Sequence, residues 1–239
     1  MIKRIGNLIT IVGVAHVLPR SIEEAQQVIA SERPEIVAVE LDPARYLALT
    51  RGARTKISDL WRAGPSVWLL TALILLIQGK FSRQTGVEAG EEMLAAVQKA
   101  KEIGAQVHLI DRDIGITLNR LLWGMPTREK LRLFGNLIVS LLPLGKGFEL
   151  GRLTEEQVVE NLLQEFRELS PRAYEVLISE RDRHMAMRLA EFLLSGKRVV
   201  CVVGAGHVPG VWEELNRLMA GKWRLNLEYA AGQISLNCE

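Results

Sequence analysis

The sequence predicts an α/β protein with a mostly parallel central sheet flanked by helices. Short apolar runs rich in valine and isoleucine alternate with longer helical patterns, as expected for strands that are buried on both faces. In addition, the run LITIVGVAHV at 8–17 returns as VVCVVGAGHV at 199–208, and each copy closes on Gly-x-x-His-Val. Open parallel sheets hold their ligand sites beyond the carboxyl ends of the strands. We therefore expect both histidines at one rim of the sheet.

The first part of the chain follows a β-α-β-α order. A capping box, Ser21-x-x-Glu24, predicts the start of the first helix, and Pro34 predicts its end. The elements expected here are a strand at 8–14, a helix to about residue 31, a strand at 36–41 and a helix from Pro43 to about residue 50.

The second part predicts two further strands separated by a long helical block. An amphipathic pattern ends at Gly104, and the turn signals between 115 and 195 separate mostly helical patterns. The elements expected are a helix at 89–103, a strand at 106–110, a largely helical insertion at about 115–195, a strand at 198–203, a helix at 211–220 and a last strand at 223–229. No low-complexity linker divides the chain, so we expect a single domain over 1–239.

Composition narrows the function classes and the compartment. The chain is 48% hydrophobic and 24% charged with a net charge of +2, and its basic residues form no concentrated stripe, so we expect no nucleic-acid partner. The two cysteines have neither metal-site nor disulfide spacing, which favours a reducing compartment. The N-terminus lacks the features of a signal peptide. We expect a cytoplasmic or membrane-associated protein.

Two apolar stretches, 66–78 and 133–144, must be covered either by the rest of the chain or by another molecule. Within the first, Pro65 leaves about 14 residues for a helix, roughly 21 Å against about 30 Å of bilayer hydrocarbon, so it does not predict a membrane span. We interpret both as core or as the interface of a homodimer, with contact to a membrane surface as the alternative.

Each expected strand end carries a polar group that could serve chemistry. These groups are His16, Glu40 with Asp42, Asp111 with Arg112, and His207. Two histidines and a carboxylate form a ligand set suited to zinc, manganese or cobalt, with an open position that activates water. We expect His16, Glu40 and His207 to bind a divalent metal ion, with Glu40 as ligand or general base. Alternatively, Glu40 caps a helix or pairs with Arg45.

Four other polar features could carry chemistry or be purely structural. Asp111-Arg112-Asp113 either orients the ligands and binds a carboxylate or is a solvated cluster. By composition, 180–184 (Glu-Arg-Asp-Arg-His) indicates an exposed helix face, and His108 a core histidine. The segment 204–210 resembles a dinucleotide-binding fingerprint, but its third glycine is one position late and the chain ends at Glu239, soon after the candidate ribose-binding Glu228.

Taken in order, five motifs resemble the TraB/PrgY family, the pheromone-shutdown type, which is related to GumN-like and Tiki proteins. They are GVAH at 13–16, PEIVAVELD at 34–42, LIDRDI at 109–114 with Thr117, Leu118 and Arg120, ERD at 180–182 with Met185 and Ala186, and VVGAGH at 202–207. The resemblance implies that His16, Glu40 and His207 form the family's common site, and it places Arg112, Glu180 and Arg181 on the family's other polar motifs.

The resemblance also implies what such a site acts on. Tiki relatives are metal-dependent proteases, whereas pheromone-shutdown members are described as blocking or sequestering a peptide signal. Many members continue into hydrophobic C-terminal segments, which implies association with a membrane.

We therefore expect a metal-dependent hydrolase, most plausibly a metallopeptidase, in which Arg112 and Arg181 stabilise negative charge or a substrate carboxylate. The alternative is a peptide-binding module that sequesters its ligand without catalysis.

Overall fold

The computed structural model describes residues 1–14, 19–51, 90–130, 132, 135 and 155–230. Three predicted features fall on the other positions: His16, the apolar stretch 66–78, and all of 133–144 except Gly135 lie outside the described residues. No helix in the described part of the chain is both long enough and apolar enough to cross a membrane.

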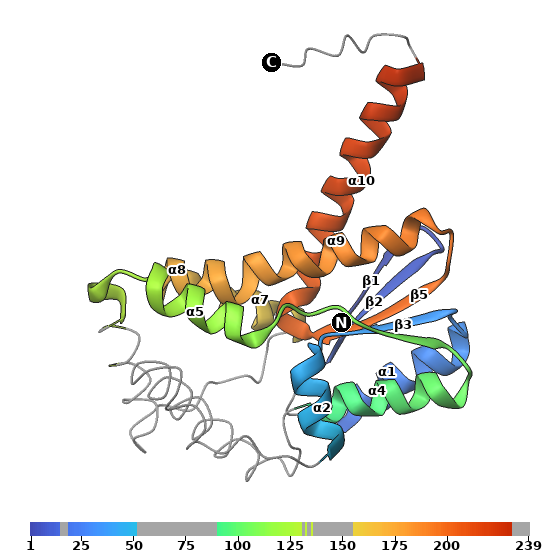
Figure 1. The fold of residues 1–239 in the computed structure, drawn as a ribbon, viewed down its shortest axis with the longest axis horizontal. Helices are drawn as coiled ribbons and strands as arrows, with labels where there is room; N and C mark the ends of the chain where they lie inside the picture. Colours follow the sequence, from blue (N-terminus) through green and yellow to red (C-terminus); the bar gives the residue numbers. More distant parts are fainter. Residues whose placement is uncertain (15–18, 52–89, 131, 133–134, 136–154, 231–239) are drawn as a thin grey trace.

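The described residues form an α/β fold around a five-stranded sheet, which confirms the predicted class (Figure 1). The strand order is β1 (Ile2–Ile5), β2 (Ile9–Val14), β5 (Val199–Gly204), β3 (Ile36–Val39) and β4 (Gln106–Leu109). The pairs β2–β5, β5–β3 and β3–β4 are parallel, whereas β1 pairs antiparallel with β2. The carboxyl ends of four parallel strands therefore meet at one rim.

Helices cover both faces of this sheet, because its side chains are apolar on both sides. On one face, Ile9 and Ile11 pack with α9 (Glu180–Leu194) and α10 (Val208–Ala230). On the other face, Val12 and Val14 pack with α1 (Pro19–Glu32) and α4 (Glu91–Glu102). Alternate residues of one strand thus supply the two cores. A register shift of one residue would exchange the two faces.

The predicted helical insertion is confirmed over the described residues between β4 and β5. It contains α5 (Ile114–Gly124), α7 (Glu155–Leu169), α8 (Pro171–Tyr174), the π-helical turn η2 (Glu175–Ser179) and α9. A small core of its own joins α5 to α8 and η2, built from Leu118, Leu121, Met125, Ala173 and Val176. α2 (Pro43–Arg51) follows β3 as expected.

Three local predictions were wrong or incomplete. The first helix begins at Pro19, so Ser21 lies inside it and is not its N-cap; proline is itself favoured at a first helical position. The strand expected at 223–229 does not form, because α10 continues without a break to Ala230. The two leucines, the arginine and the glutamate of that segment are good helix formers, which outweigh the cost of about 1 kcal/mol at Gly221. The sequence interpretation also missed β1, whose Lys3 and Arg4 suit an edge strand.

Candidate functional site

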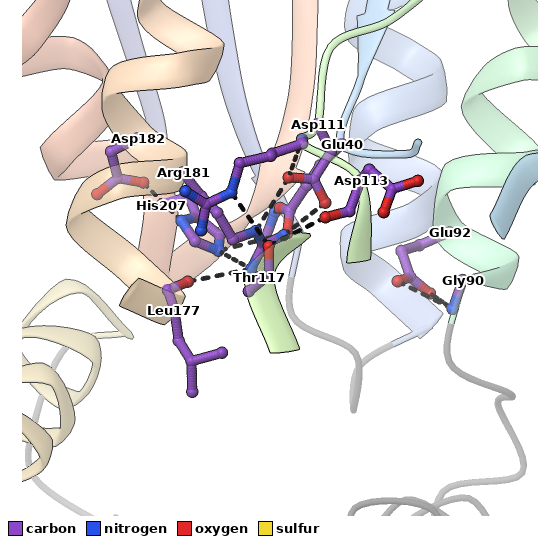
Figure 2. Close-up of polar contacts among 12 residues, drawn as sticks. Glu40, Gly90, Glu92, Asp111, Asp113, Thr117, Leu177, Arg181, Asp182 and His207 are labelled. Carbon is purple, nitrogen blue, oxygen red and sulfur yellow. Dashed lines mark hydrogen bonds and ion pairs between the residues drawn. The ribbon is translucent and has the colours of Figure 1, made fainter. Parts of the chain in front are cut away.

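Glu40 lies at the rim, directly after β3. Its main-chain N–H donates to the Val202 carbonyl on β5, and its Oε2 accepts a 2.7 Å hydrogen bond from the Gly204 N–H. Because β5 is the neighbour of β3, the sheet itself fixes this carboxylate over the end of β5. The side chain is buried, and its other oxygen, Oε1, contacts Arg181 and lies 3.3 Å from His207 Nε2 (Figure 2).

Arg181, on the first turn of α9, joins the polar groups of three strand ends. It binds Asp111 in a bidentate manner, with Nε 2.9 Å from Oδ1 and one terminal nitrogen 2.8 Å from Oδ2. The same terminal nitrogen donates to Glu40, and the other lies 3.2 Å from the Leu177 carbonyl and 3.0 Å from His207 Nε2. These contacts match the five N–H donors of a guanidinium. The arginine is therefore saturated and held in one orientation.

These contacts define the tautomer of His207, which lies in the 3₁₀ turn η3 (Ala205–His207) between β5 and α10. A guanidinium can only donate, so Nε2 must accept in the arrangement seen here, and Nδ1 carries the proton. Nδ1 lies 2.5 Å from Asp182 Oδ1, which accepts that proton's hydrogen bond. The imidazole is thus held in one orientation, with the lone pair of Nε2 directed toward Glu40 and Arg181.

Asp182 can reach His207 because α10 has a glycine where the two helices meet. A Cβ built on Gly210 would lie 2.0 Å from Asp182 Oδ2 and 2.7 Å from Cγ. Asp182 is only 3% exposed and its Oδ1 is held on His207 Nδ1, so the carboxylate can yield only by giving up that contact. Gly210 therefore makes room for the Asp182–His207 contact, which gives the last glycine of the 204–210 motif a role other than phosphate binding.

The glycine of the first motif also permits a close approach. A Cβ on Gly13 of β2 would lie 2.7 Å from a methyl group of Val208 and 3.2 Å from the Ala205 Cα. Only a residue without a side chain allows the turn after β5 to pack this tightly over β2. The repeated glycine therefore brings the two strand ends of the Gly-x-x-His motifs together.

The electrostatics keep Glu40 ionised. Burial by itself raises its pKa, but His207, Arg181 and the Gly204 N–H outweigh burial and lower the pKa from 4.5 to about 2. A carboxylate with so low a pKa is a weak general base at neutral pH. Of the two roles expected for Glu40, that of a metal ligand therefore fits better than that of a general base.

The pKa values of His207 and of its partner Asp182 are both raised. Burial lowers the pKa of His207, but the Glu40 carboxylate and the Asp182 hydrogen bond outweigh it, so the pKa is raised. Burial raises the pKa of Asp182 against the opposing effect of His207. If His207 also carried a proton on Nε2, that N–H would point toward Glu40 and would face the N–H of Arg181. Protonation of His207 and the Arg181 contact therefore exclude each other.

We expect the pH dependence of stability to carry a component from Glu40. Because its folded pKa is depressed, this contribution is fully present above pH 4.5 and is lost as the pH falls toward about 2. The shift corresponds to on the order of 3 kcal/mol. Urea unfolding at several pH values should show the difference in stability between wild type and Glu40→Gln shrinking between pH 4.5 and 2. A difference that stays constant over that range would contradict the assignment.

A second polar network lies beside the first. Arg112 donates to Glu180 over 2.7 Å, to Thr117 Oγ1 over 3.2 Å and to the Val176 carbonyl over 3.1 Å. Arg120 binds both oxygens of Glu180, at 2.7 and 2.8 Å. Arg112 follows Asp111 and Glu180 precedes Arg181 in the chain, so the two networks are joined through the backbone.

The structure thus sorts the predicted site residues into groups. Glu40, Arg181 and His207 come together, whereas Arg112 and Glu180 form the adjacent network without contacting Glu40. Asp113 instead caps α5, with Oδ1 accepting from the Gly115 and Ile116 N–H groups. His108 packs against Phe192 with ring centroids 4.7 Å apart, but it lies half-buried on the edge strand β4 and not in the core as expected.

The segment 180–184 is not simply an exposed face, as its composition indicated. Glu180 and Arg181 are largely buried and Asp182 fully so. The sequence does contain a signal for the burial of Asp182. Met185, Ala186 and Leu189 lie three, four and seven positions later, and all are buried. Asp182 therefore lies on the apolar stripe of α9, where a carboxylate requires a partner.

The donor set partly fits a metal ion. Nε2 of His207 and Oε1 of Glu40 are the nitrogen and oxygen donors that zinc, manganese and cobalt accept, and Asp182 backs the imidazole as a carboxylate does in many metal sites. Nearby, Asp42 Oδ2 is buried without a hydrogen-bond partner. Within the described ranges, however, no three His, Cys, Asp or Glu side chains group around a metal position. His16 lies outside them, and Arg181 contacts both described donors, so it would have to release them.

Comparison with known proteins identifies relatives over most of the chain. Residues 1–225 match the model of the TraB/PrgY/gumN family. An uncharacterized protein of Methanocaldococcus jannaschii is 39% identical over 220 residues, which cover 89% of this chain and 54% of that protein. TraB domain-containing proteins of Bos taurus and Homo sapiens are each 26% identical over 234 residues, covering 86% of this chain and 62% of theirs. The chain spans between about half and two thirds of the length of these relatives. The family match over nearly its whole length shows that this chain belongs to the TraB/PrgY/gumN family.

Proposed function

We propose that this chain is a metal-dependent hydrolase that acts on peptides. The observation that carries the proposal is the approach of His207 Nε2 to Glu40 Oε1 at 3.3 Å, with both side chains buried at the rim of the sheet. Each is oriented by a second group: Gly204 N–H holds Glu40, and Asp182 holds His207. Donors that are oriented by a second group in this way are typical of metal and catalytic centres.

In this proposal Glu40 and His207, with His16 as third ligand, hold a divalent ion of manganese, cobalt or zinc. Bound there, the ion would polarise the scissile carbonyl and lower the pKa of a water molecule. Glu40 is suited to be a ligand because its low pKa keeps it anionic. Asp182 positions the imidazole by accepting the Nδ1 proton.

Arg181 is the residue we expect to meet the developing negative charge. It lies between Glu40, Asp111 and His207, and its position on α9 is fixed by the bidentate contact with Asp111. When it releases Glu40 and His207, two terminal nitrogens become free to donate to an oxyanion. Arg112 and Glu180 act as positioning residues, because they fix the first turn of α9 from the neighbouring network.

A peptide-sequestering module without catalysis is the alternative, and one observation favours it. Together, Arg181, the Gly204 N–H and Asp182 satisfy the polar groups of Glu40 and His207 in the arrangement described, so the cluster does not require an ion to be paired. A cavity of about 480 Å³ beside Asp182, bounded also by Tyr174, Ser179 and Gly210, has the volume of typical ligand pockets. A bound peptide segment could fill it without being cleaved.

Cleavage of a mixed peptide library, followed by mass spectrometry, tests the proposal. Wild type, supplied in turn with manganese, cobalt and zinc, is expected to cleave library peptides, and His207→Gln to cleave at least ~100-fold more slowly. His108→Gln is the matched control, since His108 packs on Phe192 away from the site. Its rate should stay within severalfold of wild type. No cleavage by wild type with any of the metals, or equal rates in wild type and His207→Gln, would overturn the hydrolase.

A further inference from the structure

Three arginines converge on a single carboxylate beside the Glu40–His207 pair. Arg112 and Arg120 bind Glu180 at 2.7 Å, and Arg172 approaches its Oε1 at 3.8 Å. Glu180 is only 9% exposed and is held ionised, because Arg120 and Arg112 outweigh burial and lower its pKa to about 2. One negative charge thus faces three guanidinium groups. Two positive charges remain without a partner in this network.

The donors of these arginines are also incompletely used. Nε of Arg172 is buried and has no hydrogen-bond partner. Arg120 binds Glu180 through Nε and one terminal nitrogen, while its side chain stays 51% exposed. Because a guanidinium has five N–H donors, Arg120 keeps donors for a ligand that arrives from solvent.

The other arginines nearby do not change this balance. Arg183 is paired with Glu175, and Arg217 is paired with Glu214 at 2.7 Å. Each pair is neutral overall, although the Glu175 carboxylate also acts on Arg120.

Part of this excess borders a cavity of about 320 Å³, because Arg112 and Arg120 line it and Arg172 does not. Arg112, Arg120 and Glu180 form part of its wall, and His184 on α9 contributes another polar group. Met187, which is 51% exposed, and Leu218 on α10 supply an apolar wall. A cavity with guanidinium donors at one side and a thioether and an aliphatic side chain at the other suits an anion attached to an apolar group.

We propose that this cavity binds a carboxylate of the peptide ligand, with the apolar part of the same residue against Met187 and Leu218. This inference rests on the proposed function, because it names the substrate class of that site: peptides that carry a free carboxylate next to an apolar residue. Two residues that line the cavity are sequence neighbours of the first network. Arg112 follows Asp111, and Glu180 precedes Arg181. The cavity is therefore linked through the backbone to the residues around the Glu40–His207 pair. A carboxylate is preferred over an amide because guanidinium forks bind it in a bidentate manner.

Calorimetric titration with defined peptides tests the proposal without catalysis. The protein is titrated in chelator-containing buffer with N-acetyl-Ala-Ala-Leu, with its C-terminal amide, and with N-acetyl-Ala-Glu-Leu amide. Inorganic phosphate is a fourth probe. The two peptides with a carboxylate distinguish a C-terminal from a side-chain source, and phosphate distinguishes a general anion site. The variants are Arg120→Gln and the control Arg188→Gln, an arginine on α9 that is paired with Glu191.

We expect wild type to bind at least one carboxylate peptide about tenfold more tightly than the C-terminal amide, the size of one charge-assisted contact. Arg120→Gln should reduce this preference to about twofold or less, and Arg188→Gln should leave it unchanged. Equal affinity for acid and amide, tighter binding of phosphate than of either carboxylate peptide, or no binding of any peptide would overturn the proposal. Because the titration contains no metal, selective binding without peptide cleavage would refute the hydrolase alone, and cleavage without carboxylate preference would refute this site alone.

Discussion

Glu40→Gln is expected to abolish peptide cleavage and to lower the free energy of unfolding by about 3 kcal/mol at neutral pH. The reason is geometric. Oε1 of Glu40 faces a guanidinium donor and Oε2 faces the Gly204 N–H, so both oxygens accept. A glutamine amide has one oxygen and one NH₂ group. In either orientation its NH₂ group opposes an N–H, and Arg181 loses one of its two anionic partners.

The matched control for this charge removal is Glu102→Gln. Glu102 pairs with Lys99 at 2.7 Å and is 50% exposed, so its contribution is screened by water. We expect a change below about 1 kcal/mol there. Urea unfolding in metal-free buffer measures both variants. If Glu40→Gln costs no more than Glu102→Gln, Glu40 does not hold the buried network that we describe.

Activity separates the two functions in the same variant. A metal ligand that is lost should reduce cleavage by orders of magnitude, while a sequestering module should keep most of its affinity for peptide. Cleavage by Glu40→Gln at the wild-type rate would exclude Glu40 from the catalytic centre.

Gly210→Ala is expected to destabilise the protein by about 2–3 kcal/mol, the range of overpacked cores. The new methyl group would lie 2.0 Å from Asp182 Oδ2. The carboxylate cannot move aside without leaving His207 Nδ1, so cleavage should fall together with stability. Thermal unfolding and the library assay measure the two effects.

Gly221→Ala in the same helix provides a control with the opposite sign. Outside the backbone of its own helix, no atom of the described side chains and elements lies within 4 Å of a Cβ at Gly221, so alanine gains helix propensity without a clash there. We expect a stabilisation of about 0.5–1 kcal/mol. If both alanine variants stabilise the protein, the contact between Gly210 and Asp182 is not as tight as described.

The rim of the sheet could be predicted from the sequence because its information is local. Valine and isoleucine runs that end in a polar residue define strand ends, and the repeat of Gly-x-x-His defines two of them. Glu40 could be found in the same way, since it ends the run Ile-Val-Ala-Val at 36–39. The position of Glu40 over the end of β5 could not be predicted in this way, because it depends on the sheet order, which places β5 beside β3.

The partners of these residues depend on tertiary packing. Asp182 and Arg181 are separated from Glu40 by most of the chain, and only the packing of α9 over the sheet brings them to it. Composition made this segment look solvated, because five polar residues in a row are usually exposed. The helix stripe shared with Met185 was the better guide. The prediction for the end of α10 was wrong for the opposite reason. Apolar residues alternate between Trp223 and Tyr229, a local pattern that is typical of a strand, but the segment is helical.

We propose that the two Gly-x-x-His motifs and Glu40 together bind one divalent ion. The most direct measurement is elemental analysis of protein purified without chelator or affinity metal, then exposed to manganese, cobalt or zinc and desalted, beside the His16→Ala/His207→Ala double variant. We predict nearly one metal ion per chain in the wild type and none in the double variant. Absence of metal from both proteins, or equal metal in both, would contradict the account.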